Sequence, residues 1–258
     1  APEADSRRLP ARWLRKEFSL DKPVRRAVAH ICGLGLSELY LNGEKVGDHV
    51  LSPGLTEYPK RVFYVTHEVT RQLQPGQNAV GVVLGNGRYF APRLREPTLT
   101  QTYGFPKLLF QMDVEYEDGT RESIVSDATW KLTAAGPILA NNEYDGEEYD
   151  AGLEMPGWDR PGFDDEKWEP AQLVEPPAGR LVAQNMEPIR VTETLRPKAV
   201  REVRPGAGEL DYATYLKRLA ALPQQPPLMI EHLNSAEEYA AGARHLLAVG
   251  ERLGIKFE

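Results

Sequence analysis

The chain has 258 residues, a formal net charge of -7 and a single cysteine. The negative charge argues against nucleic acid or an anionic membrane surface as a partner, because neither attracts an acidic protein. No apolar run approaches the length of a membrane span, and one cysteine excludes an internal disulfide framework. The 21 prolines and 22 glycines predict a turn-rich protein, and a hydrophobic content of 41% is enough for a packed core.

The N-terminal part of the chain begins with polar residues and continues with short strands. Residues 1–9 contain no apolar signal core, which favours a cytoplasmic location over export. Strands are expected at residues 13–20 and 24–31, separated by a turn at Pro23. Cys32 directly follows the second apolar run, so we expect a buried, unreactive thiol.

The next stretch combines several signals of a β-hairpin. Residues 37–41 place Leu39 and Leu41 on one face of a strand. The dipeptide Asn42-Gly43 follows, and it tolerates positive φ at both central positions of a two-residue turn. A return strand is expected at residues 44–46. We predict that this hairpin sets the register of the sheet around it.

Further short strands follow along the chain. They are expected at residues 61–66, 79–84, 108–116, 121–125, 129–133 and 189–195. Residues 79–84 are almost continuously apolar, which is typical of a strand buried on both faces. Residues 88–103 and 141–150 show no period and are interpreted as loops, the second of them acidic and rich in tyrosine.

Many short strands separated by turns predict a mainly β protein with an antiparallel sandwich. The pattern changes after about residue 201. Residues 210–222 and the segment after Ser235 have helical spacing, and residues 226–230 form a short apolar strand. We therefore expect a β-sandwich domain at residues 1–200 and a small C-terminal α/β appendage, helix-strand-helix, at residues 201–258.

The β part, roughly residues 12–200, resembles the N-terminal β-sandwich region of bacterial α-L-rhamnosidases. The matching stretches, in the family's order, are residues 35–47, 50–54, 80–89 with the motif Leu-Gly-Asn-Gly-Arg-Tyr, 114–120, 144–151 and 157–168. The resemblance implies a galactose-binding-like jelly-roll that serves as an accessory or sugar-binding module. Hydrolysis in that family belongs to a separate (α/α)₆ barrel, which these residues do not include.

One position departs from the pattern of the family. Where the family usually has Tyr-Asp-Ala-Arg, this chain has Tyr149-Asp-Ala-Gly152. The change removes a guanidinium group that could pair with Asp150 or with a neighbouring domain. It leaves open what this loop contacts.

The tail, from about residue 206 to residue 257, resembles a different family. It is similar to the C-terminal end of a sugar phosphate isomerase/epimerase TIM barrel of the xylose-isomerase-like kind, at residues 208–216, 227–232 and 237–239. This resemblance implies that Glu231, at the end of the last strand, is a divalent-metal ligand. The other ligands of that family belong to earlier strands, which this chain lacks.

Two loops hold the candidate recognition residues. Amide, carboxylate and guanidinium groups can form hydrogen bonds with sugar hydroxyls, and tyrosine rings can stack on a pyranose. The candidates for substrate binding are Asn86, Arg88 and Tyr89 in the first loop and Asn142, Tyr144, Asp145, Glu147 and Tyr149 in the second. We expect the two loops to gather at one end of the sandwich. The alternatives are a turn in which Tyr89 packs locally and a solvated acidic loop.

Closely spaced oxygen ligands in the acidic loop suit Ca²⁺, although their spacing is not that of an EF-hand. Related rhamnose-binding modules use Ca²⁺ to hold sugar hydroxyls. The metal candidates are Asp145, Glu147 and Asp150, with Glu231 in the tail. A solvated loop with local Asx turns and no metal is favoured over a Ca²⁺ site, and Glu231, without the other ligands, is interpreted as vestigial. The histidines lack metal-ligand spacing, and core packing of Trp158 and Trp168 is favoured over a carbohydrate platform.

No pair of carboxylates stands out as a glycosidase acid/base pair, so we expect no catalytic residues and no catalysis by the chain alone. The first hypothesis is a non-catalytic, carbohydrate-binding module of an α-L-rhamnosidase-like glycoside hydrolase, with a rhamnose-containing glycan or small sugar as partner. The second is part of an active rhamnosidase or sugar isomerase/epimerase, which needs a missing barrel domain. The third is a structural buttress that binds no sugar. The candidate protein partners are a missing catalytic domain and a second copy of the chain in a homo-oligomer.

Overall fold

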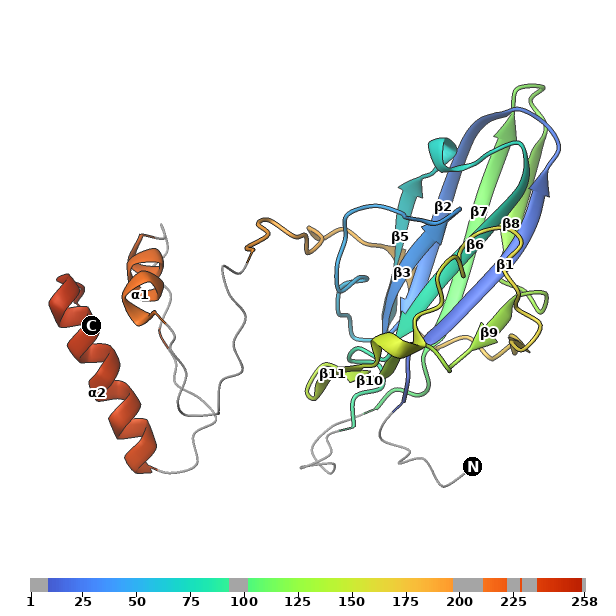
Figure 1. The fold of residues 1–258 in the computed structure, drawn as a ribbon. Helices are drawn as coiled ribbons and strands as arrows, with labels where there is room; N and C mark the ends of the chain where they lie inside the picture. Colours follow the sequence, from blue (N-terminus) through green and yellow to red (C-terminus); the bar gives the residue numbers. More distant parts are fainter. Residues whose placement is uncertain (1–8, 93–101, 197–210, 222–227, 229–235, 257–258) are drawn as a thin grey trace. The chain divides into compact units, whose positions relative to one another are not determined.

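The computed structural model describes residues 9–92, 102–196, 211–221, 228 and 236–256. The chain divides into two compact units, residues 1–194 and residues 195–258. Among the described residues, the strands lie in the first unit and the two α-helices in the second (Figure 1).

The first sheet has six strands in the order β12-β9-β1-β6-β3-β4, and its pairs are antiparallel. Its longest pair joins β1 and β6, which are in register from Arg12 opposite Leu84 to Leu20 opposite Gly76. The strands are β1 (Arg12–Leu20), β3 (Leu36–Leu41), β4 (Glu44–Lys45), β6 (Gly76–Gly85), β9 (Lys131–Thr133) and β12 (Glu169–Pro170).

The second sheet has five strands in the order β13-β5-β2-β7-β8. It is antiparallel except for β13, which runs parallel to β5. The strands are β2 (Val24–Leu34), β5 (Arg61–Glu68), β7 (Lys107–Tyr116), β8 (Arg121–Val125) and β13 (Arg180–Ala183). A separate hairpin is formed by β10 (Ile138–Asn142) and β11 (Gly146–Tyr149), and single turns of 3₁₀ helix lie at Thr70–Gln72 and Ala151–Leu153.

The two sheets pack face to face around the main hydrophobic core (Figure 1). Alternate residues of each strand point inward, so the core is built from both sheets. Full burial of one such large apolar side chain stabilises the fold by roughly 1.5–3 kcal/mol. Contributors include Leu39, Leu41, Val80 and Val82 of the first sheet and Phe110, Met112 and Val114 of the second. The expected fold class, a mainly β antiparallel sandwich with a small helical appendage, is confirmed.

The hairpin between β3 and β4 forms at the predicted dipeptide. Asn42 and Gly43 have φ values of 51° and 88°, the left-handed conformations that a two-residue turn requires. The Asn42 side chain also joins this turn to β6, because its Nδ2 donates to Oδ1 of Asn78 at 2.8 Å and its Oδ1 accepts from the Ala79 amide at 2.9 Å. These bonds tie the hairpin to the neighbouring strand, as expected of a segment that sets the register.

Two predictions about the β region are wrong. Residues 141–150 were expected to be a loop, but most of them form the β10–β11 hairpin, whose turn is closed by Gly146 with a φ of 75°. Residues 189–195 were expected to be a strand, but they form only an isolated bridge between Arg190 and His49. Apolar alternation at Ile189 and Val191 was misleading because both side chains are exposed.

The second unit contains the helices α1 (Tyr212–Ala220) and α2 (Ala236–Leu253), where helical spacing was predicted. Asp211 caps α1 by accepting a hydrogen bond from the Thr214 amide at 3.1 Å. Gly254, with a φ of 68°, ends α2. The strand predicted at residues 226–230 falls almost wholly outside the described residues, as does Glu231. Neither helix has the length and apolar character needed to cross a membrane.

Candidate functional site

Asn86 lies directly after β6 and joins three segments of the chain. Its Nδ2 donates to the carbonyl oxygens of Leu9, at 2.6 Å, and Asn141, at 2.8 Å. Its Oδ1 accepts from Arg12 at 2.6 Å, and its backbone amide donates to Oδ1 of Asn141 at 2.6 Å. Because the side chain is only 1% exposed, Asn86 holds the site together from inside and offers no surface to a ligand.

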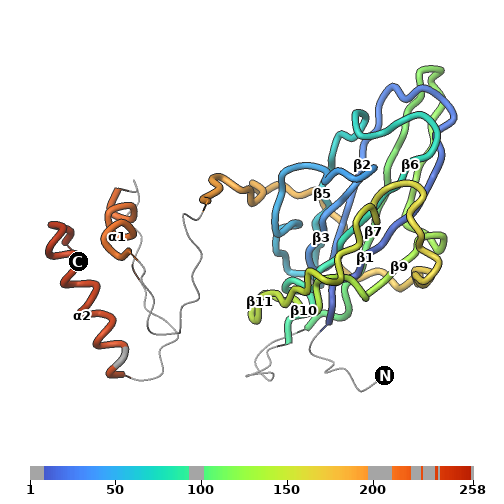
Figure 2. The backbone as a smooth tube through the Cα atoms, in the orientation of Figure 1, coloured from blue at the N-terminus to red at the C-terminus, as the bar shows by residue number. Residues whose placement is uncertain are grey.

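The two predicted loops meet at one end of the sandwich, as expected. The amide of Glu143, in the turn between β10 and β11, donates to the carbonyl oxygen of Gly87 at 3.3 Å. Nε of Arg88 lies 3.3 Å from the Glu143 carboxylate. Figure 2 shows the β10–β11 hairpin beside the end of the sandwich where β1 begins. We call the residues Arg88, Tyr103, Glu143 and Tyr144 the arginine corner.

Arg88 is the centre of this corner. Its guanidinium carbon lies 5.6 Å from the ring centroid of Tyr103 and 5.7 Å from that of Tyr144. Both distances are within the range of cation–π attraction. The Arg88 side chain is 21% exposed and Tyr144 is 41% exposed, so the corner presents a cation, a carboxylate and an aromatic ring at the surface.

Tyr89 points away from this surface and packs locally. It is buried in a tyrosine cluster, with its ring centroid 5.0 Å from that of Tyr58 and 6.0 Å from that of Tyr103. Burial, with the charge of Glu143 adding to it, raises the pKa of Tyr58 to about 12. A second small core of Cys32, Leu34 and Val62 continues the cluster. The structure therefore places the Tyr89 ring inside the tyrosine cluster, where it packs against Tyr103 of the corner.

Cys32, in this second core, fits the unreactive thiol expected from the sequence. The side chain is buried, and burial raises its pKa to about 11. A thiol with a raised pKa carries little thiolate near neutral pH, which disfavours nucleophilic chemistry.

The remaining candidates of the second loop shape the β10–β11 turn. Oδ1 of Asn142 accepts from the amides of Tyr144, at 2.7 Å, and Asp145, at 2.8 Å, while its Nδ2 donates to the Asp145 carboxylate at 3.0 Å. Glu147 is exposed and lies opposite Asn141 in the hairpin. The Tyr149 hydroxyl donates to Glu154 at 2.7 Å. The side chain of Asn142 therefore shapes the turn, and the neighbouring Tyr144 ring lies beside the Arg88 guanidinium.

The carboxylates of the hairpin do not converge on a metal position. Asp145 bonds within the turn, and Asp150 accepts from the Gly152 amide at 2.9 Å. In the part of the chain that the structure describes, no group of three or more His, Cys, Asp or Glu side chains could hold a metal ion. The residues of this loop therefore do not fit a Ca²⁺ site built from their carboxylates, and Glu231 lies outside the described residues.

Trp158 and Trp168 are buried, so core packing is the correct interpretation of both residues. Their rings stack with centroids 6.4 Å apart, and Trp13 meets Trp158 edge to face at 4.7 Å.

The ring centroids of His49 and His67 lie 5.4 Å apart. Burial is the main cause that lowers the pKa of His67 to about 4. Nothing in this arrangement suggests ligand contact.

Sequence reasoning missed Tyr103 and Glu143, two of the four residues of the arginine corner. Glu143 lies inside the acidic stretch, and the Asp145-Gly146 dipeptide is a hairpin signal that would have placed it in a turn. Tyr103 reaches the corner because its amide donates to the Tyr89 carbonyl at 3.0 Å. No local pattern in the sequence predicts that contact.

The α-L-rhamnosidase N-terminal domain family matches residues 22–193, which is more than half of the chain. The chain belongs to this family. The resemblance of the β part to rhamnosidases is thereby confirmed, and the match covers both loops of the arginine corner.

Similar proteins include much longer α-L-rhamnosidases. One from Streptomyces avermitilis is 40% identical over 210 residues, covering 78% of this chain and 20% of that protein. One from Formosa agariphila is 37% identical over 207 residues, covering 78% and 22%. The chain thus spans about a fifth of the length of the curated relatives it matches.

Solved structures agree with this assignment. The α-L-rhamnosidase from Dictyoglumus thermophilum has a TM-score of 0.67 at 48% identity, covering 76% of this chain and 21% of that one. The Streptomyces avermitilis α-L-rhamnosidase complexed with L-rhamnose has a TM-score of 0.66 at 38% identity, covering 72% and 18%. The resemblance of the tail to a sugar isomerase/epimerase barrel receives no support from these comparisons.

Proposed function

We propose that the chain acts as a non-catalytic, carbohydrate-recognising domain of an α-L-rhamnosidase-type glycoside hydrolase. The observation that carries the proposal is the arginine corner, where the partly exposed Arg88 lies between the rings of Tyr103 and Tyr144 and beside the Glu143 carboxylate. Guanidinium donors and carboxylate acceptors can bind sugar hydroxyls, and an exposed tyrosine ring can cover the apolar face of a pyranose.

The fixed geometry of the corner supports recognition. Asn86 and Asn142 hold its two loops by hydrogen bonds. Arg88 also lies over the ring of Tyr103, which packs against the buried tyrosine cluster. A side chain that is already held in position loses less conformational entropy when a ligand binds. Such a corner can therefore bind a small ligand with few contacts.

The carboxyl groups of the described residues support a non-catalytic role. A glycosidase needs a carboxylic acid with a raised pKa opposite a second carboxylate. Every carboxyl shift resolved in this part of the chain is in the opposite direction. A hydrogen bond from Lys16, for example, lowers the pKa of Asp127 to about 2.

The proposed ligand is a rhamnose-containing glycan or small sugar. Two solved relatives are named as α-L-rhamnosidases, and the structure of one is a complex with L-rhamnose. Because this chain spans about a fifth of such proteins, hydrolysis would need a further catalytic domain. The competing proposal is that this chain is part of an active rhamnosidase and turns over substrate once that domain is supplied.

A second candidate role is structural, as a buttress for the rest of a longer enzyme or for a second copy of the chain. It is favoured by large apolar side chains on two touching segments, residues 48–55 and 184–190, which are joined by a hydrogen bond from the Val50 amide to the Ile189 carbonyl at 2.9 Å. The exposed side chains there are Leu51, Leu55, Met186 and Ile189. Exposed apolar patches commonly mark protein interfaces.

Calorimetric titration of the full chain with L-rhamnose tests the first role. We expect weak binding, with a dissociation constant on the order of 1 mM, that is lost in Arg88→Ala. Arg121→Ala is the matched control, since Arg121 is also ion-paired, with Glu115 at 3.2 Å, but lies on β8. Binding should not change when a chelator removes Ca²⁺.

Three outcomes separate the proposals. Absence of binding to L-rhamnose and to a rhamnose-containing oligosaccharide would favour the buttress. Equal losses in Arg88→Ala and Arg121→Ala would mean that the arginine corner is not the binding site. Turnover of a rhamnoside by the chain alone would contradict the non-catalytic role.

A further inference from the structure

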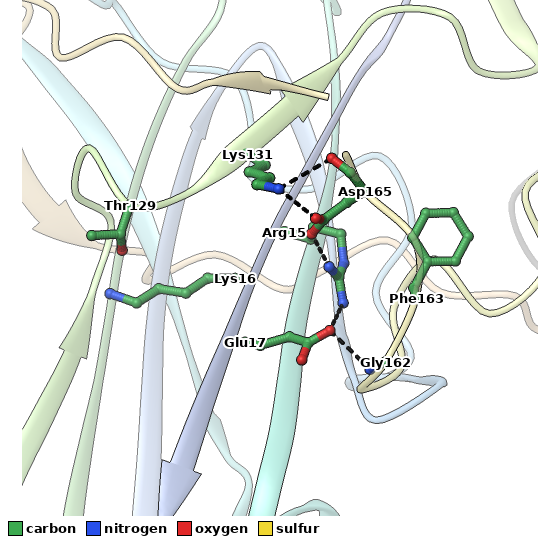
Figure 3. Close-up of a pocket in the computed structure, with 8 residues that line it drawn as sticks. All are labelled: Arg15, Lys16, Glu17, Thr129, Lys131, Gly162, Phe163 and Asp165. Atoms are coloured by element: carbon green, nitrogen blue, oxygen red, sulfur yellow. Dashed lines mark hydrogen bonds and ion pairs between the residues drawn. The ribbon is translucent and has the colours of Figure 1, made fainter. Parts of the chain in front are cut away.

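A hollow of about 390 Å³ lies beside β1, built from elements other than those of the arginine corner. It opens where β9 ends, because β9 pairs with β1 only from Trp13 to Arg15. In the described part of the chain, the next residues of β1 have no strand partner on that side. The segment that contains Phe163 and Asp165 closes the other side of the hollow (Figure 3).

Buried hydrogen bonds hold the wall of this hollow in place. Arg15 is 1% exposed, and its guanidinium donates to Asp165, to Glu17 at 2.5 Å and to the Trp158 carbonyl at 2.8 Å. The Glu17 carboxylate also accepts from the Gly162 amide at 2.9 Å. The groups around the opening are therefore preorganised by contacts behind them.

Each lysine that lines the hollow is ion-paired with a carboxylate, and the partner of Lys16, Asp127, lies outside the lining. Nζ of Lys131 donates to Asp165 at 2.6 Å, and Nζ of Lys16 donates to Asp127 at 2.8 Å. An ammonium group has three N–H donors, and a carboxylate can accept several hydrogen bonds. An uncharged polyhydroxyl ligand can use the remaining capacity without breaking an ion pair, whereas an anion would have to compete with Asp127 or Asp165.

Phe163 adds an aromatic surface to this polar lining. Its ring centroid lies 5.5 Å from the Arg15 guanidinium carbon and 5.9 Å from the Trp168 ring centroid, in an edge-to-face contact. Figure 3 shows the ring beside Arg15 at one edge of the hollow. Hydrogen-bonding groups of both kinds next to an aromatic ring match a sugar, which has hydroxyls at its rim and C–H groups on its face.

We infer that this hollow binds one uncharged, pyranose-sized unit of a glycan, at a site separate from the arginine corner. The inference goes beyond the proposed function, since it stands on Lys16, Glu17, Lys131 and Phe163 whether or not Arg88 contacts sugar. Two weak sites on one domain would strengthen attachment to a polymeric glycan through effective concentration.

Protein-observed NMR on the isotope-labelled full chain tests this site. The probes are L-rhamnose, D-galactose and D-glucose, with inorganic phosphate as the anionic comparison. We expect at least one sugar to shift the amide signals of Thr129, Gly162 and Phe163, and phosphate to leave them unchanged. Phe163→Ala should weaken this response about tenfold, equivalent to about 1.4 kcal/mol.

Matched variants make the test specific. Lys22→Ala, which removes another ion-paired lysine with its partner Asp118 at 2.8 Å, should leave the response unchanged. Arg88→Ala should leave it unchanged as well. Lys16→Gln serves as the second variant if Phe163→Ala does not fold, because it keeps the aromatic packing.

The outcomes at the two sites can be distinguished. No response of the hollow to any of the three sugars overturns the inference, even if signals at Arg88 move and support the proposed function. A response to phosphate alone also overturns it, and so does a loss of response in Arg88→Ala. A response in the hollow without one at Arg88 would uphold the inference and contradict the arginine corner as the recognition site.

Discussion

Arg15 and Arg88 are both adjacent to aromatic rings and both pair with carboxylates, but they differ in what surrounds them. Arg15 lies within β1, is 1% exposed, and donates to two carboxylates and to the carbonyl oxygens of Trp158 and Arg160. Arg88 lies just after β6, is 21% exposed, and pairs with Glu143 beside two tyrosine rings.

This difference separates a structural arginine from one that can meet a ligand. A buried guanidinium must have its hydrogen bonds satisfied by the protein, since an unpaired buried charge is costly. A partly exposed guanidinium can be reached by a ligand at the surface. We therefore expect substitutions around Arg15 to affect stability and substitutions at Arg88 to affect binding.

The largest effect is expected from Arg15→Met. It leaves Asp165 and two backbone carbonyls without their buried donor, so the free energy of unfolding should fall by about 3–5 kcal/mol. Urea denaturation followed by tryptophan fluorescence measures this change. Arg121→Met, at an exposed ion pair, is the control and should change stability by no more than about 0.5 kcal/mol. Equal effects of the two substitutions would contradict the structural role of Arg15.

Asn86→Ala should have the next largest effect and tests the framework of the corner. It removes three partly buried side-chain hydrogen bonds, which join Asn86 to Arg12 and to the carbonyl oxygens of Leu9 and Asn141. We expect a loss of about 2–3 kcal/mol in the free energy of unfolding, because unsatisfied buried polar groups cost more than the bonds themselves contribute. Binding of L-rhamnose should also weaken, since the hydrogen bond from the Asn86 side chain to the Asn141 carbonyl, which joins the two loops, is lost. A stable variant with unchanged binding would show that Asn86 does not position Arg88.

Acid should weaken the Arg15 region through Asp165. Burial opposes ionisation of this carboxyl, but hydrogen bonds from Lys131 and Arg15 outweigh it and lower the pKa below its ordinary value. A carboxyl with a lowered pKa in the folded state adds stability above the pKa of the unfolded chain, and this contribution is lost as the pH falls through the folded pKa. In Asp165→Asn, stability at neutral pH should be lower, and the dependence of unfolding on pH below the ordinary carboxyl pKa should be shallower. Parallel pH profiles of the two proteins would refute this assignment.

Arg88→Ala should have the smallest effect on stability. Its partly exposed ion pair with Glu143 contributes less than about 1 kcal/mol, whereas sugar binding should weaken by about tenfold or more. Denaturation and calorimetric titration of the same preparation measure the two quantities together. A large loss of stability would mean that Arg88, like Arg15, has a mainly structural role, and would contradict the contrast between the two residues.

Local patterns in the sequence predicted much of the sandwich. The alternation of apolar residues predicted the inward face of β7, and the dipeptide Asn42-Gly43 predicted the β3–β4 turn. Both predictions succeeded because side-chain period and turn conformation depend on near neighbours in the chain. The same reasoning failed at residues 189–195, where apolar residues alternate but find no strand partner beyond one bridge. Pairing depends on residues far away in the sequence, which alternation does not report.

The candidate site was predicted in part. Arg88 and Tyr144 were named, and the expected meeting of their two loops is observed. Asn86 and Tyr89 were named too, but burial gives them supporting roles. A polar or aromatic residue after a strand has the same local sequence whether its side chain turns outward or inward.

Residue order and short-range periodicity were enough to predict the β class, the β3–β4 turn, the helical tail and the family of the β part. The tertiary structure was needed to show which arginine is buried, which tyrosine is exposed, and that Glu143 and Tyr103 join Arg88. Those features depend on contacts between segments tens of residues apart in the chain. Burial at such contacts sets whether a charged or aromatic side chain is satisfied within the protein or available to a ligand.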